Sequence, residues 1–268
     1  MKIYSYYFKK LDLALVDGVI FLSPYSKREA ENFDFKEIEE LVSKLHSSNK
    51  QAFLDITSVI QEKELTEFKD FIFKSKDLGI DKYLFEDYSV LNLISHDKLI
   101  YASQTLTASS HEVLFYNNLG VETLVSSELN EEELKTIDFH NNYYKVYGPV
   151  LVFYSKRKMF TLYNKKYRKS VKYFVPYALK EAKREEENLV GYEGRNNFLI
   201  YTKDKYFGLG ELKKLKIEKI ILDDFLSEPQ RIAELLVAIR NDSDIKIKED
   251  EKFFFLKDEL VILEDKND

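Results

Sequence analysis

The sequence predicts an α/β protein built on a (β/α)8 barrel of the TIM type. Short apolar runs alternate with stretches of helical spacing, and that alternation requires right-handed crossovers and a parallel sheet. Roughly eight such units fit into about 240 of the 268 residues, near the usual size of this barrel. A doubly wound sheet is the alternative, but it usually carries a Gly-rich loop after its first strand. Here Leu22–Ser26 has no GxGxxG pattern.

In the first half of the chain, apolar runs predict buried strands and apolar faces predict the helices between them. Asp17–Leu22 is almost continuously apolar, as buried parallel strands are. Lys36–Ser47 follows, with Ile38, Val42 and Leu45 on one helical face. The same patterns place strands at 51–56, 81–85, 98–102 and 121–125, and helices at 64–78, 110–119 and 130–140.

Helix ends support these assignments. Gly79 and Gly120 stand just after two of the predicted helices, where a glycine in the left-handed conformation often ends a helix. Asn130 with Glu133 has the spacing of a capping box.

The second half is less regular. A strand at 143–147 is expected to break at Gly148 and Pro149, and the chain is extended again over 150–154. A further strand is predicted at 219–222, and a helix begins at Pro229, which suits the first helical position. We therefore expect one barrel domain over 1–268, an irregular insertion with β-hairpins at about 156–210, and a terminal hairpin at about 251–264.

Composition excludes several classes of protein. The chain has no cysteine, which rules out disulfides, thiolate metal sites and a cysteine nucleophile. No apolar stretch is long enough to span a membrane and the first ten residues do not resemble a signal peptide, so a cytoplasmic protein is expected. The formal net charge of −6 excludes a uniformly basic nucleic-acid binder but allows a local basic patch.

No catalytic motif stands out. The histidines at 46, 96, 111 and 140 form no close pair, and neither GxSxG nor a P-loop occurs, so no metal and no cofactor are predicted. If the barrel is right, polar residues after the strands face its functional end. The catalytic candidates are Asp55, Asp87, Glu128 and Tyr147, and the ligand-binding candidates are Ser103, Gln104 and Ser126. Each could equally cap a helix or bind loop backbone.

The strongest anomaly is the segment Lys156–Lys172. It holds eight Lys and Arg residues and no acidic residue, so without it the formal net charge would fall from −6 to −14. Aromatic side chains interleave with the cations, which suits RNA, since cations contact phosphates and rings stack on bases. The RNA-binding candidates are Lys156, Arg157, Lys158, Tyr163, Lys165, Lys166, Arg168 and Lys169. The alternative is a solvated loop neutralised by the acidic stretch 181–187.

Several segments together resemble the collagenase-like peptidase family U32. The central ones are Tyr101–Thr105, Val113–Val125 and Ser126–Leu134, which resemble the family's "Ser-x-Gln", "elGv.rv" and "REL…eei" blocks. Weaker matches are Asp17–Phe21, Ser26–Arg28, Asn32–Phe33, Gly79–Asp87, Tyr147–Gly148 and Val152–Ser155. The resemblance covers about residues 15–242 and implies a barrel-like fold.

The resemblance also implies chemistry. The family's name implies proteolysis, while other members take part in hydroxylating RNA bases or a quinone precursor, often with an iron–sulfur cluster on four cysteines. Where the family places those cysteines, this chain has Met159–Tyr163, Tyr173–Phe174 and Asp204–Phe207. Without thiolates that cluster cannot form.

Three functions follow as alternatives. The first is a cluster-free partner of a longer, cysteine-bearing relative in tRNA wobble-uridine hydroxylation, with tRNA as a possible ligand. The second is a protease, and the third is a barrel that binds a small molecule without catalysis. The predicted polar rim is compatible with each.

Overall fold

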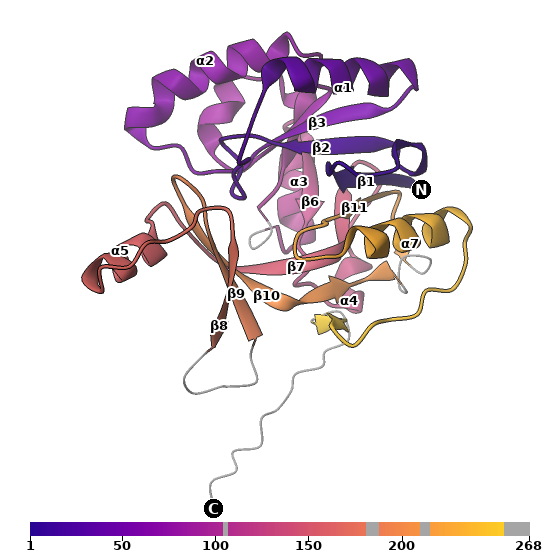
Figure 1. Cartoon of the computed structure of the whole chain (residues 1–268). Helices are drawn as coiled ribbons and strands as arrows, with labels where there is room; N and C mark the ends of the chain where they lie inside the picture. The colour runs from indigo at the N-terminus through magenta and orange to yellow at the C-terminus, as the bar shows by residue number, and fades with distance from the viewer. Residues whose placement is uncertain (104–106, 181–187, 210–214, 255–268) are drawn as a thin grey trace, which may run out of the picture.

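The computed structural model describes residues 1–103, 107–180, 188–209 and 215–254. Eight parallel strands form a closed barrel, because β11 pairs with both β7 and β1 (Figure 1). The strands follow in chain order: β1 (Lys2–Tyr6), β2 (Gly18–Leu22), β3 (Gln51–Ile56), β4 (Lys82–Phe85), β5 (Leu99–Tyr101), β6 (Glu122–Val125), β7 (Tyr143–Ser155) and β11 (Lys219–Leu222). The predicted (β/α)8 barrel is confirmed, and the doubly wound alternative is wrong.

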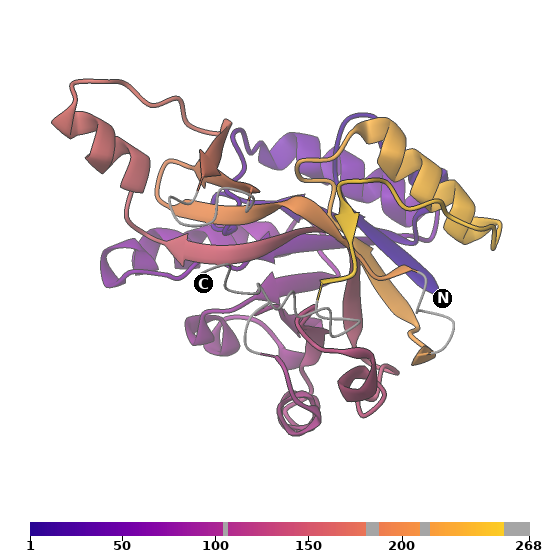
Figure 2. The ribbon, with the colours of Figure 1, turned by 90° about the horizontal axis from the view of Figure 1, so that it is seen from below.

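Helices and short 3-10 turns connect the strands on the outside of the barrel (Figure 2). The helices are α1 (Phe35–Ser47), α2 (Leu65–Lys76), α3 (Ser110–Asn118), α4 (Glu131–Leu134) and α7 (Pro229–Arg240). The 3-10 turns are η1 (Leu13–Leu15), η2 (Glu62–Glu64), η3 (Tyr88–Asn92) and η4 (His96–Lys98). Gly79 and Gly120 adopt φ values of 76° and 77°, as expected for glycines that end helices.

The barrel interior is filled with side chains from alternate strand positions. Tyr4, Phe53 and Tyr143 pack ring against ring there, with centroids 4.8 to 5.9 Å apart. Ile20, Leu84, Ile100 and Ile221 complete this inner cluster. The interior is therefore a packed core rather than a channel, as in other TIM barrels.

Two features of the barrel itself differ from the sequence-based expectations. Strand β1 was not predicted, since only five residues carry its pattern and Ser5 interrupts their apolar character. The helix expected to run to residue 140 ends at Leu134, although its Asn130–Glu133 capping box is present. It ends early because the chain bends there, so that Ile137 and Phe139 reach the core.

The predicted break at Gly148 and Pro149 is a bend within one continuous strand. β7 runs through both residues to Ser155, and its second half leaves the barrel to pair with β10 (Phe198–Phe207). β10 continues to β9 (Asn188–Glu193), which pairs with β8 (Pro176–Lys180). This antiparallel extension provides the predicted hairpins.

The extension also carries a helix that the sequence pattern did not predict. α5 (Met159–Lys166) follows β7 and projects away from the barrel (Figure 1). The cap of its N-terminus comes from a residue that is remote in the sequence. The buried Glu193 carboxylate accepts hydrogen bonds from the backbone N–H of Phe160 at 2.7 Å and from that of Thr161. A cap supplied by another strand leaves no local sequence signal.

Of the predicted terminal hairpin, only the beginning is described. β12 (Glu251–Lys252) pairs in parallel with β10, and Glu251 forms a buried bidentate ion pair with Arg231 of α7. Most of that hairpin, and the acidic stretch 181–187, lie outside the described residues.

Candidate functional site

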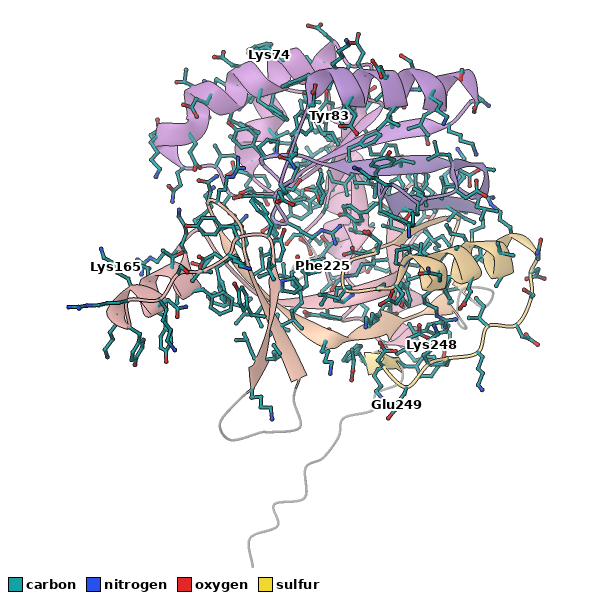
Figure 3. The ribbon with its side chains drawn as sticks, in the orientation of Figure 1. Lys74, Tyr83, Lys165, Phe225, Lys248 and Glu249 are labelled. Atoms are coloured by element: carbon teal, nitrogen blue, oxygen red, sulfur yellow. The ribbon has the colours of Figure 1, made fainter. Side chains whose placement is uncertain are left out.

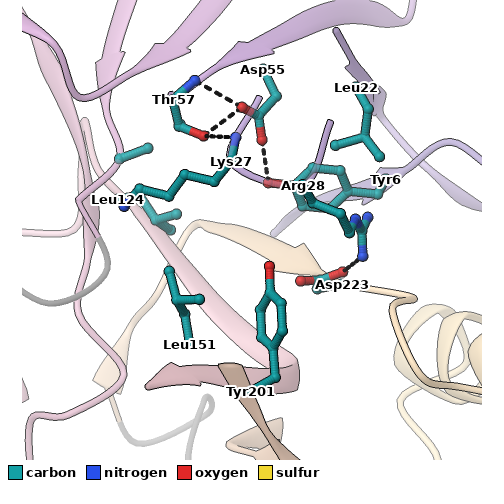
Figure 4. A pocket seen from close by; sticks show the side chains of 11 residues that line it. Tyr6, Leu22, Lys27, Arg28, Asp55, Thr57, Leu124, Leu151, Tyr201 and Asp223 are labelled. Atoms are coloured by element: carbon teal, nitrogen blue, oxygen red, sulfur yellow. Dashed lines mark hydrogen bonds and ion pairs between the residues drawn. The ribbon is translucent and has the colours of Figure 1, made fainter. Parts of the chain in front are cut away.

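The carboxyl ends of the barrel strands enclose a small polar cavity (Figure 4). Its polar lining comes from strand ends and the loops after them: Tyr6, Lys27, Arg28, Asp55, Thr57 and Asp223. Leu151 and Tyr201 of the antiparallel extension cover it from above the barrel. Its position is where TIM barrels place their functional groups.

Arg28 is the central cation of this site. Its guanidinium donates to Asp223 at 2.8 Å and to Asp224 at 3.3 Å, and all three side chains are largely buried. The rings of Tyr6 and Phe225 lie 5.0 and 4.8 Å from the guanidinium carbon. Although burial lowers the pKa of Arg28, the two carboxylates outweigh it and raise that pKa overall. Burial raises the pKa of Asp224 to about 6.

Asp55 forms a second polar centre on the other side of the cavity. Its carboxylate accepts hydrogen bonds from the Thr57 hydroxyl at 2.7 Å, the Thr57 backbone N–H at 3.0 Å and the Tyr6 hydroxyl at 3.1 Å. Burial raises the pKa of Asp55 in spite of these bonds. Asp55 and Arg28 thus share Tyr6 as a neighbour, and the three groups form one connected network.

Lys27 and Lys145 place two further cations near the cavity. Lys27 forms an ion pair with Glu86, and its ammonium lies 5.5 Å from the centre of the Tyr154 ring of the extension. Lys145 is 2% exposed and lies on the same face of β7 as Tyr143. Its Nζ donates to the Pro149 carbonyl at 2.9 Å, and burial lowers its pKa to about 8.

The cavity is too small for a substrate in this conformation. Its volume is about 30 Å³, and because one water needs roughly 10–15 Å³, it holds about two waters. The charged groups around it pair with one another, so this arrangement ties the strand ends and the loops after them together.

Only one of the predicted catalytic candidates lines this cavity. Asp55 does, whereas Asp87 caps η3 through Ser89 and accepts a hydrogen bond from the backbone N–H of Ile60. Glu128 is exposed overall, but partial burial of its carboxyl group raises the pKa of that group. The structure therefore does not gather these carboxylates at one cavity.

Tyr147 points out of the barrel. The pairing of β7 with β11 shifts register between Lys145 and Tyr147, as at a β-bulge, and the shift turns Tyr147 into the outer core. There its ring packs edge-on against Phe207, and burial raises its pKa to about 12.

The ligand-binding candidates also lie beside the cavity rather than on it. Ser103 and Ser126 are fully buried, and Ser126 accepts a hydrogen bond from the backbone N–H of Glu128 at 3.1 Å. Gln104 lies outside the described residues. No ligand tests the roles proposed for these residues, which stay predictions.

The site residues that sequence reasoning missed come from separate parts of the chain. Tyr6 ends the strand that was not predicted, and Asp223 follows β11 directly. Arg28 occurred only within a segment quoted for its family resemblance. The rule that led to Asp55, a polar residue just after a strand, would also have selected Asp223.

Gly148 makes the close approach of β7 and Asp223 possible. Its φ is 132°, and a Cβ at this position would lie 2.6 Å from the Asp223 Cβ. We expect Gly148→Ala to lower the free energy of unfolding by about 1–3 kcal/mol from backbone strain alone, with a further loss from the clash. Gly120→Ala is the matched control, since its φ of 77° is also positive but its nearest neighbour lies 3.8 Å away. Urea unfolding of both variants measures the difference, and equal losses would contradict the clash.

The basic segment forms an exposed surface around α5 (Figure 3). Arg157, Lys165, Lys166, Arg168 and Lys169 are exposed, and Tyr163 and Tyr167 lie 5.0 Å apart with exposed fractions of 63% and 50%. Lys156 and Lys158 were also predicted to belong to this surface, but both contact other side chains instead. Lys156 pairs with Glu64 at 3.1 Å, and the ammonium of Lys158 lies over the Tyr173 ring.

The comparison with known families decides the classification. The model of peptidase family U32 matches residues 14–259. The chain belongs to peptidase family U32. The match includes the resembling segments found in the sequence and spans the barrel from β2 onward together with its extension.

Similarity to individual proteins is remote. No curated protein matches the chain. Among solved structures it is similar to the U32 peptidase Mk0906, with 11% identity, a TM-score of 0.49 and coverage of 83% of this chain and 92% of that one. It is also similar to the Bacillus cereus spore cortex-lytic enzyme SleL, with 11% identity, a TM-score of 0.45 and coverage of 92% and 75%.

The residues present do not fit the four-cysteine cluster of some U32 proteins. The segments that stand where the family places those cysteines contain no thiolate and lie in separate surroundings: Tyr163 is exposed on α5, while Tyr206 is buried against Tyr144. Within the described part of the chain, no three His, Asp or Glu side chains are grouped for a metal ion. None of the described helices has both the length and the apolar character needed to cross a bilayer.

Proposed function

We propose that this U32 protein is a cluster-free accessory subunit in tRNA wobble-uridine hydroxylation, and that it binds RNA through α5. A longer, cysteine-bearing relative is the proposed partner and supplies the iron–sulfur cluster that this cysteine-free chain cannot build. A cytoplasmic location is part of the proposal.

The exposed basic and aromatic surface of α5 carries this proposal. Its five exposed cations have no acidic neighbour within Lys156–Lys172, on a chain that is acidic elsewhere. The Tyr163 and Tyr167 rings stand beside them, 63% and 50% exposed, although they also contact each other and Lys166 lies over the Tyr167 ring. Proteins that bind unpaired RNA commonly combine cations that neutralise phosphates with aromatic rings that stack on bases.

The small cavity supports an accessory role over independent catalysis. It holds about two waters, and its carboxylates are engaged with Arg28, Thr57 and Tyr6. The peptidase alternative has the family's name in its favour, and digestion of collagen or casein by the purified protein tests it.

Charge reversal on α5 should weaken RNA binding. We expect Lys165→Glu, Lys166→Glu and Arg168→Glu together to flatten the salt dependence of tRNA binding by about 2 in logarithmic slope, since each lost phosphate contact removes about 0.7. Fluorescence anisotropy across a salt titration measures it. The control reverses Lys36, Lys44 and Lys74, three exposed lysines of α1 and α2. Equal tRNA affinity for wild type and the α5 variant would end the RNA assignment.

The cellular role is tested separately. Mass spectrometry of bulk tRNA from a deletion strain should show loss of wobble-uridine hydroxylation, restored by the wild-type gene and not by the α5 triple variant. Unchanged modification in the deletion strain would refute the accessory role even if RNA binding is real.

A further inference from the structure

Helix α5 is too short to be stable by itself. It has eight residues, none of them buried, and an isolated helix of fewer than about 12 residues is marginal in water. Its own sequence provides no start signal. The residue at the N-cap is Lys158, whose side chain makes no capping hydrogen bond, and the first turn contains no acidic residue. The support that keeps α5 helical therefore comes from another part of the chain.

That support comes from β9 of the extension. The Glu193 carboxylate accepts hydrogen bonds from the backbone N–H groups of Phe160 and Thr161 and from the Thr161 hydroxyl. These two N–H groups are the second and third of the helix, and in most helices an N-cap side chain would accept one of them. A carboxylate also suits this end of α5, because the helix dipole is positive there.

A second contact fixes the orientation of α5 on the same strand. The Phe160 ring packs against Phe198 and Tyr177, with centroids 4.7 and 5.2 Å apart. It also lies over Gly191, two residues before Glu193, where a Cβ would be 2.4 Å from the ring. β9 thus holds the first turn of α5 at two adjacent points, while the exposed lysines of the last turn point away from the barrel (Figure 3).

We propose that Glu193 is a positioning residue for the RNA-binding surface of α5. The inference rests on the proposed RNA binding and adds a residue that cannot itself contact RNA, since Glu193 is 0% exposed. Tyr163 and Tyr167 come within 5.0 Å because the chain between them is helical. If α5 were folded in only a fraction of the molecules, the apparent affinity for RNA would fall by that fraction.

The variant Glu193→Gln separates positioning from electrostatics. Removing a negative charge from the region that binds phosphates should strengthen RNA binding, whereas loss of the cap should weaken it. We expect tRNA affinity to fall about fivefold or more, the factor that corresponds to the loss of a typical cap. The slope of the salt dependence should stay unchanged, because the bound state keeps the same phosphate contacts. Fluorescence anisotropy across a salt titration measures both quantities.

The matched control is Glu29→Gln. Glu29 is 4% exposed, and its carboxylate also accepts two backbone N–H bonds, from Arg195 at 2.7 Å and from Asn196 at 2.9 Å. These bonds join the turn after β9 to the loop after β2 and do not involve α5. Glu29→Gln should therefore leave tRNA affinity unchanged.

A new cap within α5 should rescue the variant. Lys158→Asn places an amide oxygen at the N-cap position, where it can accept the Thr161 N–H. Added to Glu193→Gln, it should restore most of the lost affinity, whereas in the wild type it only removes one cation, and the double-mutant cycle separates the two effects. Hydrogen exchange of residues 162–166 follows α5 itself. It should become faster in Glu193→Gln and slow again in the double variant.

The outcomes distinguish this inference from the RNA proposal. A wild type that does not bind tRNA refutes both. If the wild type binds tRNA and Glu193→Gln binds it equally well or more tightly, the positioning role is overturned and the RNA proposal stands. Equal losses in Glu193→Gln and Glu29→Gln, or no rescue by Lys158→Asn, also overturn the positioning role, because the loss then does not depend on the start of α5.

Discussion

Replacing Arg28 by methionine is expected to lower the free energy of unfolding by about 3–5 kcal/mol, because it leaves Asp223 and Asp224 as buried carboxylates without a cation. The variant also loses the stacking of the guanidinium between Tyr6 and Phe225. Urea unfolding at neutral pH measures the loss, which is a large share of the stability of most domains.

Two further variants separate charge from shape in this experiment. Arg240→Met is the matched control, because Arg240 pairs with Asp17 at 2.7 Å where both side chains are about one-third exposed, and such pairs contribute about 0–1 kcal/mol. Adding Asp223→Asn and Asp224→Asn to Arg28→Met should restore part of the stability. If Arg28→Met and Arg240→Met lose equal amounts, the buried network is not a determinant of stability.

The second large effect concerns Lys145, whose replacement by methionine should stabilise the protein at neutral pH. Burial lowers the pKa of Lys145 from 10.5 to about 8, so below pH 8 the folded protein holds a charged ammonium in a buried place. The lowered pKa corresponds to about 3 kcal/mol, from which the hydrogen bond to Pro149 offsets about 1 kcal/mol. We therefore expect a gain of about 2 kcal/mol at pH 7.

The pH dependence gives this prediction its sign. The free energy of unfolding of the wild type should rise with pH between pH 8 and about 10.5. Over this range the folded protein has released the Lys145 proton, whereas the unfolded chain still binds it. The advantage of Lys145→Met should vanish over that range, while the exposed control Lys44→Met shows no such trend. A variant that is less stable than wild type by the same amount at pH 7 and pH 10.5 would show that the ammonium is not the source.

Most of the barrel could be predicted from the sequence because its signals are local. Apolar runs located seven of the eight barrel strands, six of them to within about a residue and β7 at its start, and glycines marked two helix ends. What the sequence did not reveal depends on distant partners. The start of α5 is capped by Glu193, thirty-three residues from Phe160, and β1 is recognisable only through its pairing with β2 and β11.

The candidate site was less predictable for a similar reason. Strand-end position led to Asp55, which lines the cavity, but the orientation of a strand-end side chain depends on register. The shift in the β7–β11 pairing turns Tyr147 outward while Lys145 stays inside, and no local pattern records it. Arg28 is a site residue because the fold brings its guanidinium within hydrogen-bonding distance of Asp223 and Asp224, which lie almost two hundred residues later in the sequence.

The continuity of β7 affects how α5 is positioned relative to the barrel. Although it bends at Gly148, β7 passes from the barrel into the extension as one continuous strand, and β10 pairs with it along both parts. Tyr154 adds a brace, since its hydroxyl bonds Ser58 and Val59 of the barrel loops. The extension is therefore attached to the barrel at two places, so an RNA bound by α5, as we propose, would be held at a set distance and orientation from the carboxyl end of the barrel.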